Sequence, residues 1–381
     1  MKLRVPIPNT SFRLGLLIMI LKVFLSVSGI AEVPDSLDTI LSIAASGLLA
    51  GSILQKAYPV KTLFVFICIT LLGMLTSVRT GNMMVFIAII TCLAMCGEDL
   101  DKAIAFMFFW ESLFLILTIL LSAALHLSGN SMLTRVSGVM RYNFGYSHPN
   151  IFSCILTNLF AMYLWKHYNS VGVRHALIIC LIEFVVYKMT DSRTGLIVTL
   201  FLVLFTMLFR NNQKPCRFLK FMAAYAVPVL TVMFYCLCKL FASGNGFALL
   251  LDKLISGRIR LGAYSLNRFG VSFLGQNLSM AEVKWDAFWK LNSITFDNIY
   301  TYLLVTECIW LVVVMVLFYQ TVKKSDIKYC VFILAWALYG ISEIHVINPF
   351  LFFAVVIVTS LFQRDKREAH TWKRNPGNWS A

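Results

Sequence analysis

The chain has 381 residues, of which 59% are hydrophobic and only 13% are charged, and its mean hydropathy is +0.79. Ordinary soluble domains contain roughly 45–50% apolar and about 25% charged residues, so this composition excludes a soluble enzyme. The formal net charge is +15, but the basic residues occur in small groups between apolar runs rather than along one face, which does not fit a nucleic-acid-binding protein. We therefore expect no nucleic-acid partner.

Long apolar runs dominate the chain. A transmembrane helix needs roughly 20 mostly apolar residues, whereas a membrane β-barrel would show segments of about ten residues with alternating polarity. The unbroken runs predict an all-α, polytopic integral membrane protein with about twelve transmembrane helices. We place these near 13–31, 37–55, 61–78, 82–97, 103–126, 150–165, 175–189, 195–209, 218–242, 297–319, 328–341 and 348–363. Eleven is the alternative count, because three of these segments are shorter than a full span and one could be re-entrant.

The distribution of Lys and Arg predicts the orientation, because short cytoplasmic loops carry an excess of both. With the N-terminus inside, most basic residues of the short connections fall inside, and the short outside loops hold only Arg79, Arg135, Arg141, Lys188 and Arg193. We therefore expect both termini in the cytoplasm. Residues 1–381 then form a single membrane domain, and residues 364–381 form a basic cytoplasmic tail.

One connection, residues 243–296, is predicted to be a long outside loop. Structureless loops of this length are uncommon unless they are functional. Within it, Leu251, Leu254, Ile255 and Arg258 share one helical face, so part of the loop is a candidate amphipathic helix on the membrane surface.

The chain contains no P-loop, no dinucleotide-binding Gly-x-Gly-x-x-Gly, no His-Glu-x-x-His and no Gly-x-Ser-x-Gly, which are the common signatures of nucleotide, metal and serine-hydrolase sites. Cys92 and Cys96 are one helical turn apart, but no His or second Cys pair nearby completes a zinc site. We therefore expect no cofactor and no metal.

Most of the unusual polar clusters fall on the outside. The first is residues 141–150, Arg-Tyr-Asn-Phe-Gly-Tyr-Ser-His-Pro-Asn, with Arg141, His148 and Asn150 at the outer start of a predicted helix. A helix N-terminus favours anions, which makes this cluster a candidate binding site. The alternative is a turn with a helix cap, because Pro149 suits the first helical turn.

Two further clusters carry arginine. Residues 191–195, Asp-Ser-Arg-Thr-Gly, form a predicted external turn that contains Arg193; a capped glycine turn is the alternative. In the long loop, Arg258, Arg260 and Arg268 follow Ser256 and Gly257. Guanidinium groups bind phosphates in bidentate fashion, so these arginines indicate a diphosphate or other polyanion, with headgroup anchoring by a surface helix as the alternative.

The last outside clusters combine carboxylates with other polar groups. Asp297, Asn298 and Tyr300 lie where the long loop re-enters the membrane, and Glu343 and His345 precede the last predicted helix. A carboxylate and an imidazole two residues apart can serve as a base and its orienting partner. Interfacial helix caps are an equal alternative.

Several ionisable residues lie instead within the apolar runs: Lys22, Glu111, Glu183 and Glu307. Intramembrane ionisable residues are functional candidates by default, and these could mark a transport path.

Taken in order, these motifs resemble those of the Wzy-type polymerases of O-antigen and capsule repeat units, within the O-antigen ligase and polymerase superfamily. The resemblance rests on residues 141–350 and on the topology of about twelve helices. The segments that carry it are 141–150, Ser192-Arg193-Thr194-Gly195, Gly257-Arg258, Asp297-Asn298-x-Tyr300, Glu343 and Asn348-Pro349.

The resemblance implies a metal-independent glycosyltransferase with a GT-C-like fold, in the cytoplasmic membrane of a bacterium with its active site on the extracytoplasmic side. Such enzymes join oligosaccharide repeat units carried on undecaprenyl diphosphate, so the expected partners are a lipid-linked glycan donor and acceptor and the lipid bilayer. A flippase and a chain-length regulator are candidate protein partners.

The resemblance and the residue chemistry together give the candidate roles. Cationic groups stabilise the charge that the diphosphate gains as the glycan leaves, and the candidates are Arg141, Arg193, Arg258, Arg260 and Arg268. The acceptor hydroxyl needs a base, for which His148, Glu343 and His345 are the candidates, with His148 ranked first because it lies in the best-matched motif. The expected substrate-positioning residues are Asn150, Asp297, Asn298 and Tyr300.

Two alternative functions remain open. A ligase of the same superfamily, which moves a finished glycan to a final acceptor, would use the same diphosphate chemistry. A transporter or flippase of lipid-linked sugars should instead have internal repeats, broken helices and charges at the membrane midplane, whereas the unusual charges here gather at the outer boundary.

Overall fold

The computed structural model describes residues 10–30, 32–125, 132–134, 138, 140–211, 216–278, 286, 288–289, 291 and 293–362. The basic tail predicted at 364–381 lies outside the described residues. The described elements, in chain order, are α1 (Thr10–Val27), α2 (Asp35–Leu54), α3 (Val60–Thr80), α4 (Met84–Met95), α5 (Leu100–Ala124), β1 (Met132–Thr134), β2 (Met140–Tyr142), α6 (Pro149–Lys166), α7 (Val173–Thr190), α8 (Arg193–Phe209), α9 (Arg217–Ala242), α10 (Gly246–Leu254), α11 (Arg258–Phe269), α12 (Ile299–Glu307), α13 (Ile309–Lys324), α14 (Ile327–Gly340) and the 3₁₀ segments η2 (Ile344–Ile347) and η3 (Phe353–Phe362).

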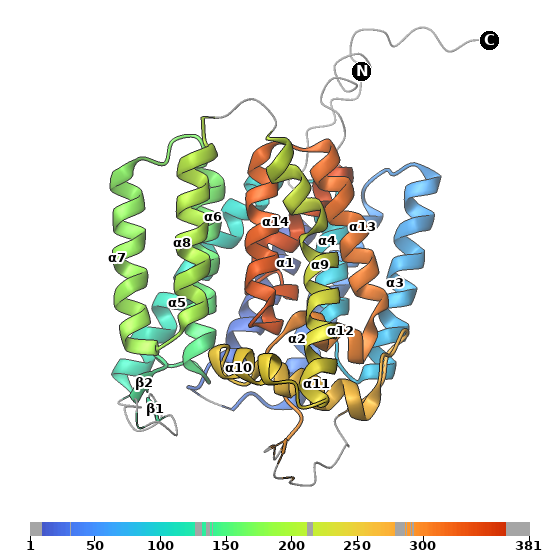
Figure 1. The fold of residues 1–381 in the computed structure, drawn as a ribbon. Coiled ribbons are helices and arrows are strands. Elements are labelled where there is room, and N and C mark those ends of the chain that lie inside the picture. The colour runs from blue at the N-terminus through green and yellow to red at the C-terminus, as the bar shows by residue number, and fades with distance from the viewer. Residues whose placement is uncertain are drawn as a thin grey trace, which may run out of the picture.

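Several of these helices have the length and composition of membrane spans. Among the described residues, five helices are long and apolar enough to cross a membrane, namely α1, α2, α3, α5 and α9. Shorter apolar helices are α4, α8, α14 and η3. The helices agree with the predicted all-α membrane protein, and most of them run side by side in one bundle (Figure 1).

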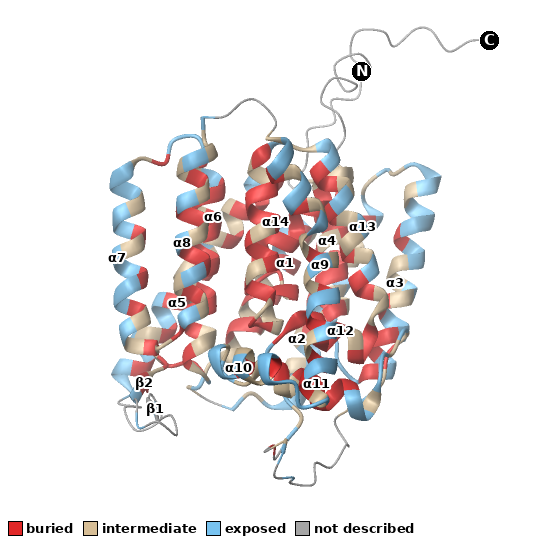
Figure 2. Ribbon diagram, viewed as in Figure 1, coloured by how far each residue is buried: buried red, intermediate tan, exposed pale blue. Residues whose placement is uncertain are grey.

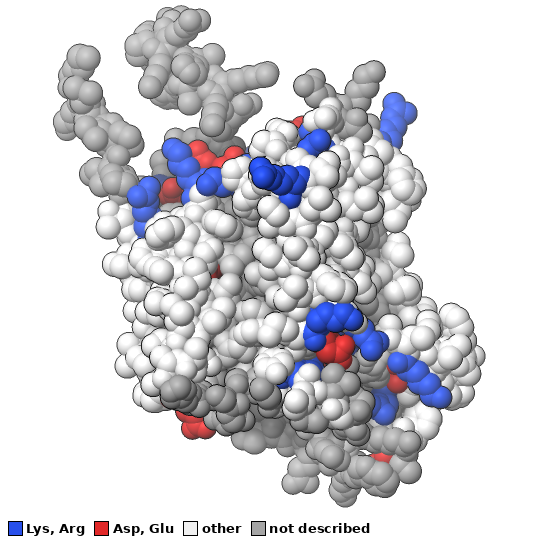
Figure 3. Space-filling model, turned by 90° about the vertical axis from the view of Figure 1, so that its left-hand side faces the viewer, with Lys and Arg blue, Asp and Glu red and all other residues white. Residues whose placement is uncertain are grey.

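The distribution of apolar side chains on the outer helices also fits a lipid environment. α7 exposes Leu177, Leu181 and Val185 while it buries Glu183 and Thr190, which is the reverse of a helix at a water-exposed surface. The exposed outer side of α7 is visible in Figure 2. Figure 3 shows charged side chains gathered towards two opposite ends of one face, with a broad, mostly uncharged belt between them.

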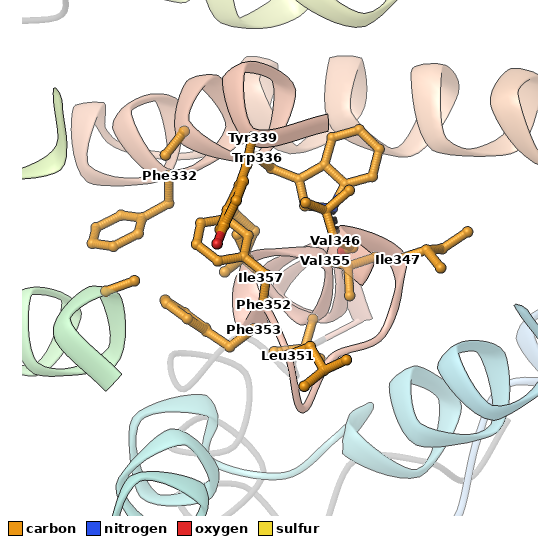
Figure 4. Packing of buried hydrophobic residues seen from close by; sticks show 14 of the residues in the cluster. Phe332, Trp336, Tyr339, Val346, Ile347, Leu351, Phe352, Phe353, Val355 and Ile357 are labelled. Carbon is orange, nitrogen blue, oxygen red and sulfur yellow. Dashed lines mark hydrogen bonds between the residues drawn. The ribbon is translucent and has the colours of Figure 1, made fainter. Parts of the chain in front are cut away.

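The interior is built around α14. This helix packs against α8, α9, α13 and η3, and its Trp336 is completely buried. The aromatic rings of Phe332 and Phe353 lie 5.5 Å apart between α14 and η3, and Trp336 donates a 2.7 Å hydrogen bond from Nε1 to the carbonyl of Val346 (Figure 4). The packed core therefore fixes the chain that joins α14 to η3, which includes Glu343 and His345.

The helix predicted at 297–319 is instead divided into α12 and α13 at Cys308. The amide of Cys308 donates to the carbonyl of Ser272 (2.8 Å) and the amide of Ile309 to that of Phe273 (3.2 Å). These two amides therefore do not donate to the carbonyls four residues earlier, as they would in a continuous α-helix. The helix is interrupted at Cys308, where residues 272–273 lie against it.

The predicted long loop and last helix also differ from expectation. The described part of residues 243–296 contains two helices, α10 and α11. Arg258 begins the second, so it does not share a helix with Leu251 and Leu254. The turn between them uses Ser256 and Gly257, both with positive φ. The helix predicted at 348–363 is a 3₁₀ segment that starts only at Phe353.

Candidate functional site

The predicted polar clusters come together at one end of the bundle, where β2, α10 and α11 lie (Figure 1). We call this the α11 end. Hydrogen bonds, one ion pair and electrostatic effects connect seven side chains there, which we call the Glu343 cluster: Arg141, His148, Asn150, Arg258, Asp297, Glu343 and His345. They come from four separate stretches of the chain.

Arg141 is a buried cation whose direction is fixed by two contacts. It lies on β2, which pairs in antiparallel fashion with β1, and its side chain is only 5% exposed. Its Nε donates to the carbonyl of Thr190 at the end of α7 (2.5 Å), and its Nη2 donates to Oδ1 of Asn150 (2.5 Å). Because Asp191 adopts a left-handed conformation after α7 (φ 51°), the chain turns there immediately after the carbonyl that receives Arg141.

His148 and Asn150 form the start of α6. His148 is the N-cap residue, and its Nδ1 accepts a 3.1 Å hydrogen bond from the backbone amide of Asn150. The Nδ2 of Asn150 donates to Oε1 of Glu343 (3.2 Å), while its Oδ1 accepts from Arg141. Asn150 thus joins the cation to the carboxylate.

Glu343 is a buried carboxylate held between two packed regions. It follows α14 directly and is only 7% exposed. The preceding Ser342 donates its hydroxyl to Oγ1 of Thr194 at the start of α8 (2.8 Å). Burial raises the pKa of Glu343 to about 8, and Asp297 acts in the same direction, although Arg258, the hydrogen bond from Asn150 and Arg141 each oppose the shift. A carboxyl with this pKa can exchange a proton near neutral pH.

The start of α11 carries two arginines, of which Arg258 belongs to the cluster. Asp252 is buried and accepts the backbone amide of Arg260 (2.8 Å), which fixes the first turn of α11. The Nε of Arg258 lies 3.9 Å from Oδ2 of Asp297, beyond hydrogen-bonding distance. Nε of Arg258 and Nε of Arg260 are both buried and have no hydrogen-bond acceptor among the described residues. Buried donors without acceptors are unfavourable, so these two guanidinium groups suit an anionic ligand.

His345 adds an imidazole to the same region. Burial lowers its pKa, the positive charge of His148 acts in the same direction, and Asp297 opposes both. His345 is therefore predominantly neutral at pH 7, because its pKa is already below the ordinary value of about 6.5.

The structure leaves other predicted site residues outside the cluster. Arg193 is exposed at the start of α8, although its neighbour Thr194 contacts Ser342. Arg268 is also exposed, and its guanidinium lies over the ring of Tyr264 and donates to the hydroxyl of that residue. The sequence grouped Arg268 with Arg258, but it lies in the last turn of α11, away from the first.

Asn298 and Tyr300 have roles in packing at the start of α12. Asn298 caps the helix by accepting the amide of Thr301 (3.0 Å) and donates from Nδ2 to the carbonyl of Ile341 (2.8 Å). Tyr300 is fully buried and donates to the carbonyl of Ala337 (2.6 Å). Both residues fix α12 against α14, and Asn298 thereby positions the neighbouring Asp297.

Some groups that hold the residues of this site in place were not identified from the sequence. Main-chain carbonyls such as that of Thr190 leave no signal in a residue pattern, and the contact between Ser342 and Thr194 joins residues 148 positions apart. Thr194 belongs to segment 191–195, which the sequence had singled out for Arg193. Among the described residues, no three His, Cys, Asp or Glu side chains form a metal-binding group.

The arrangement can bind an anion and move a proton. Arg141, Arg258 and Arg260 provide positive charge at the α11 end, and the charges of Arg141 and Arg258 both act to lower the pKa of Glu343. Such a site can stabilise a departing anion while a carboxylate accepts a proton. Comparisons of the chain with protein-family models, with curated proteins and with solved structures find no match.

Proposed function

We propose that this protein is a glycosyltransferase of the GT-C class that joins oligosaccharide repeat units carried on undecaprenyl diphosphate, at the extracytoplasmic face of a bacterial cytoplasmic membrane. The observation that carries the proposal is the convergence of Glu343 with Arg141, Asn150 and Arg258 at one end of a bundle of apolar helices. The identity of the lipid carrier and the polymerase reaction come from the resemblance of the motifs that supply these residues.

In the proposed reaction, a hydroxyl of the acceptor sugar attacks the anomeric carbon of the donor glycan. A carbon–oxygen bond forms, the bond from that carbon to the diphosphate oxygen breaks, and the diphosphate leaves with the bonding electron pair. The hydroxyl proton passes to the carboxylate of Glu343. Arg141 and Arg258 stabilise the negative charge that develops on the diphosphate, as positioned donors do at other developing anions.

The geometry favours Glu343 over His148 as the base. The Nδ1 of His148 accepts the amide of Asn150, so in the neutral ring the proton is on Nε2, which is then a donor. Glu343, by contrast, has a pKa of about 8, close to the value at which a general base combines availability with strength. His148 serves in this proposal as a cap and as a hydrogen-bond donor.

The test is a polymerisation assay with purified protein in liposomes and a synthetic undecaprenyl-diphosphate repeat unit. We expect a ladder of products that persists in EDTA and that is lost in Arg141→Ala. A single addition to a different acceptor would instead identify a ligase. Movement of the repeat unit across the bilayer without any new glycosidic bond would contradict the proposal and identify a transporter.

A further inference from the structure

A cavity of about 1140 Å³ lies apart from the residues of the Glu343 cluster. It is lined by residues of α1, α2, α3, α4 and α12 and, outside these helices, by residues 81–83, 276–278, 294, 296 and 348. Ligand pockets are ordinarily about 300–1,000 Å³, so this space exceeds what one small metabolite needs. Nothing in the reaction proposed above uses it.

The cavity changes in character along α2. At the α11 end its wall includes Asp38, Asn82 and Asn277, and deeper in the bundle it includes Ala50 and Ile90. Residues 38 and 50 are about 18 Å apart along the helix axis at 1.5 Å per residue, which is more than half of the roughly 30 Å hydrocarbon thickness of a bilayer. The cavity therefore suits a molecule with one polar and one apolar end.

The polar end is close to electrically neutral. Lys22 is the basic side chain in the wall, and its Nζ lies 3.2 Å from Oδ1 of Asp38. That same oxygen accepts the hydroxyl of Ser26 (2.6 Å). The charge of Lys22 is thus compensated within the protein, in contrast to the buried guanidinium Nε atoms at the start of α11, so an anionic headgroup would meet the carboxylate of Asp38.

The remaining groups of the polar end suit hydroxyl groups. The wall includes the side-chain amides of Asn82 and Asn277, and the rings of Phe296 and Tyr302. Asn82 donates to the hydroxyl of Tyr302 (3.2 Å), which fixes both side chains. Amides accept and donate hydrogen bonds at once, as sugar hydroxyls require, and aromatic rings offer flat apolar faces.

We infer that this cavity binds a glycolipid with an uncharged, hydroxyl-rich headgroup at the α11 end and its apolar chain between α2 and α3. Asn348 lines the cavity, and its backbone amide donates to the carbonyl of His345 (2.9 Å). Only the short η2 segment therefore separates the bound headgroup from the Glu343 cluster. In the proposed reaction donor and acceptor both carry a diphosphate, so an uncharged glycolipid in this cavity goes beyond the proposed function.

Two glycines of α2 provide a matched test. Gly47 lines the cavity and Gly51 does not, and an added Cβ would meet nothing within 4 Å at either position. The probe is an alkyl β-glucoside with a photoreactive diazirine in its chain, cross-linked to the protein in phosphatidylcholine nanodiscs and mapped by peptide mass spectrometry. In Gly47→Leu we expect roughly tenfold weaker labelling of the α2 and α3 peptides, the loss that about 1.4 kcal/mol of overpacking against the bound chain produces. In Gly51→Leu we expect labelling as in the unaltered protein.

Ser46→Leu, at a second lining position, repeats the test if Gly47→Leu fails to fold. Equal labelling of a cavity-filled variant and of Gly51→Leu would overturn the inference. So would equal labelling by a phosphatidylcholine probe, which would show a general lipid groove, or stronger labelling by an alkyl phosphate probe. If the glucoside labels the cavity but no repeat-unit ladder forms, the proposed function fails and the cavity remains a glycolipid site.

Discussion

Two polar regions lie on either side of the η2 segment, and they differ in charge and in space. In the Glu343 cluster, Arg258 is only loosely paired and its buried Nε has no acceptor among the described residues. In the cavity beside α2, Lys22 has a close partner in Asp38, and about 1140 Å³ is open to a ligand. A buried charge without a full partner is costly in a protein interior, so the first region suits a charged ligand and the second an uncharged one.

The first prediction concerns Glu343, the buried carboxylate that feels the charges of Arg141 and Arg258. Glu343→Gln should keep the contact with Asn150 but remove the proton acceptor. General-base groups contribute about 10²–10⁴-fold to rate, so we expect a loss of that size in the initial rate of polymerisation. Because burial raises the pKa of Glu343 to about 8, the carboxyl is mostly protonated at pH 7 and the rate of the unaltered enzyme should rise as the pH increases through about 8.

The measurement is the initial rate of ladder formation against pH for both proteins, with thermal unfolding as a check of folding. Loss of the alkaline rise in Glu343→Gln would support the role of the carboxylate as base. A variant with an unaltered rate and pH profile would assign the rise to another group.

The second prediction sharpens the role of the cations in the Glu343 cluster. Arg141→Ala should lower the rate by about 10²–10³-fold, the effect of removing one positioned donor from a developing anion. Arg268→Ala should change the rate little, because that side chain lies on Tyr264 at the far end of α11. The same liposome assay compares the two variants, and equal losses would show that net positive charge rather than position matters.

The comparison also shows how far the sequence could predict this site. The short polar motifs at the ends of the apolar runs singled out Arg141, Arg258 and Glu343, and the structure brings these three residues together. Local spacing failed for Arg268, since nine residues of α11 separate it from Arg258. No sequence pattern indicated the α2 cavity, because its wall is assembled from five helices and several loop segments that lie far apart in the sequence.

The fold, too, could be predicted only in part from the sequence. Apolar runs predict where helices lie, but the break at Cys308 arises from amides that bond to carbonyls of residues 272–273. A hydrogen bond to a distant main-chain carbonyl depends on tertiary structure alone. The 3₁₀ form of η3 likewise follows an apolar sequence that is compatible with an α-helix.

The third prediction concerns Gly195, which the sequence indicated only as a turn residue. A Cβ at this position would lie 2.1 Å from Oγ of Ser153 and 3.1 Å from Oε1 of Glu183, so α8 approaches α6 and α7 too closely for any side chain. Gly195→Ala should destabilise the protein by about 1–3 kcal/mol through overpacking.

The matched control is Gly51→Ala, where a Cβ meets nothing within 4 Å. It should stabilise α2 by up to about 1 kcal/mol, since alanine favours a helix over glycine. Thermal unfolding in the same detergent measures both variants, and shifts of the same sign would contradict the close packing at Gly195.

The prediction with the smallest expected effect concerns η2, the segment between the Glu343 cluster and the cavity beside α2. It tests whether packing of the core fixes the position of η2. Trp336 donates from Nε1 to the carbonyl of Val346 in η2 (2.7 Å), and Trp165 donates from Nε1 to Oδ1 of Asp101 (2.8 Å). Both indoles are almost completely buried. Replacement by Phe removes one hydrogen bond in each case, at a net cost of about 0.5–1.5 kcal/mol for the bond to the neutral Val346 carbonyl and about 1.5–3 kcal/mol for the bond to the Asp101 carboxylate.

Both substitutions should lower the unfolding temperature, Trp165→Phe by more because it also removes the indole ring that lies beside Lys328, yet only Trp336→Phe should also slow polymerisation. Its lost bond fixes η2, which lies between Glu343 and Asn348, whereas Asp101 belongs to the first turn of α5. Because Glu343 precedes η2 directly, a shift of this segment changes the distance between the carboxylate and Asn150. A slower rate in both variants would mean that stability rather than position limits the activity, whereas a selective loss in Trp336→Phe ties the rate to the placement of η2.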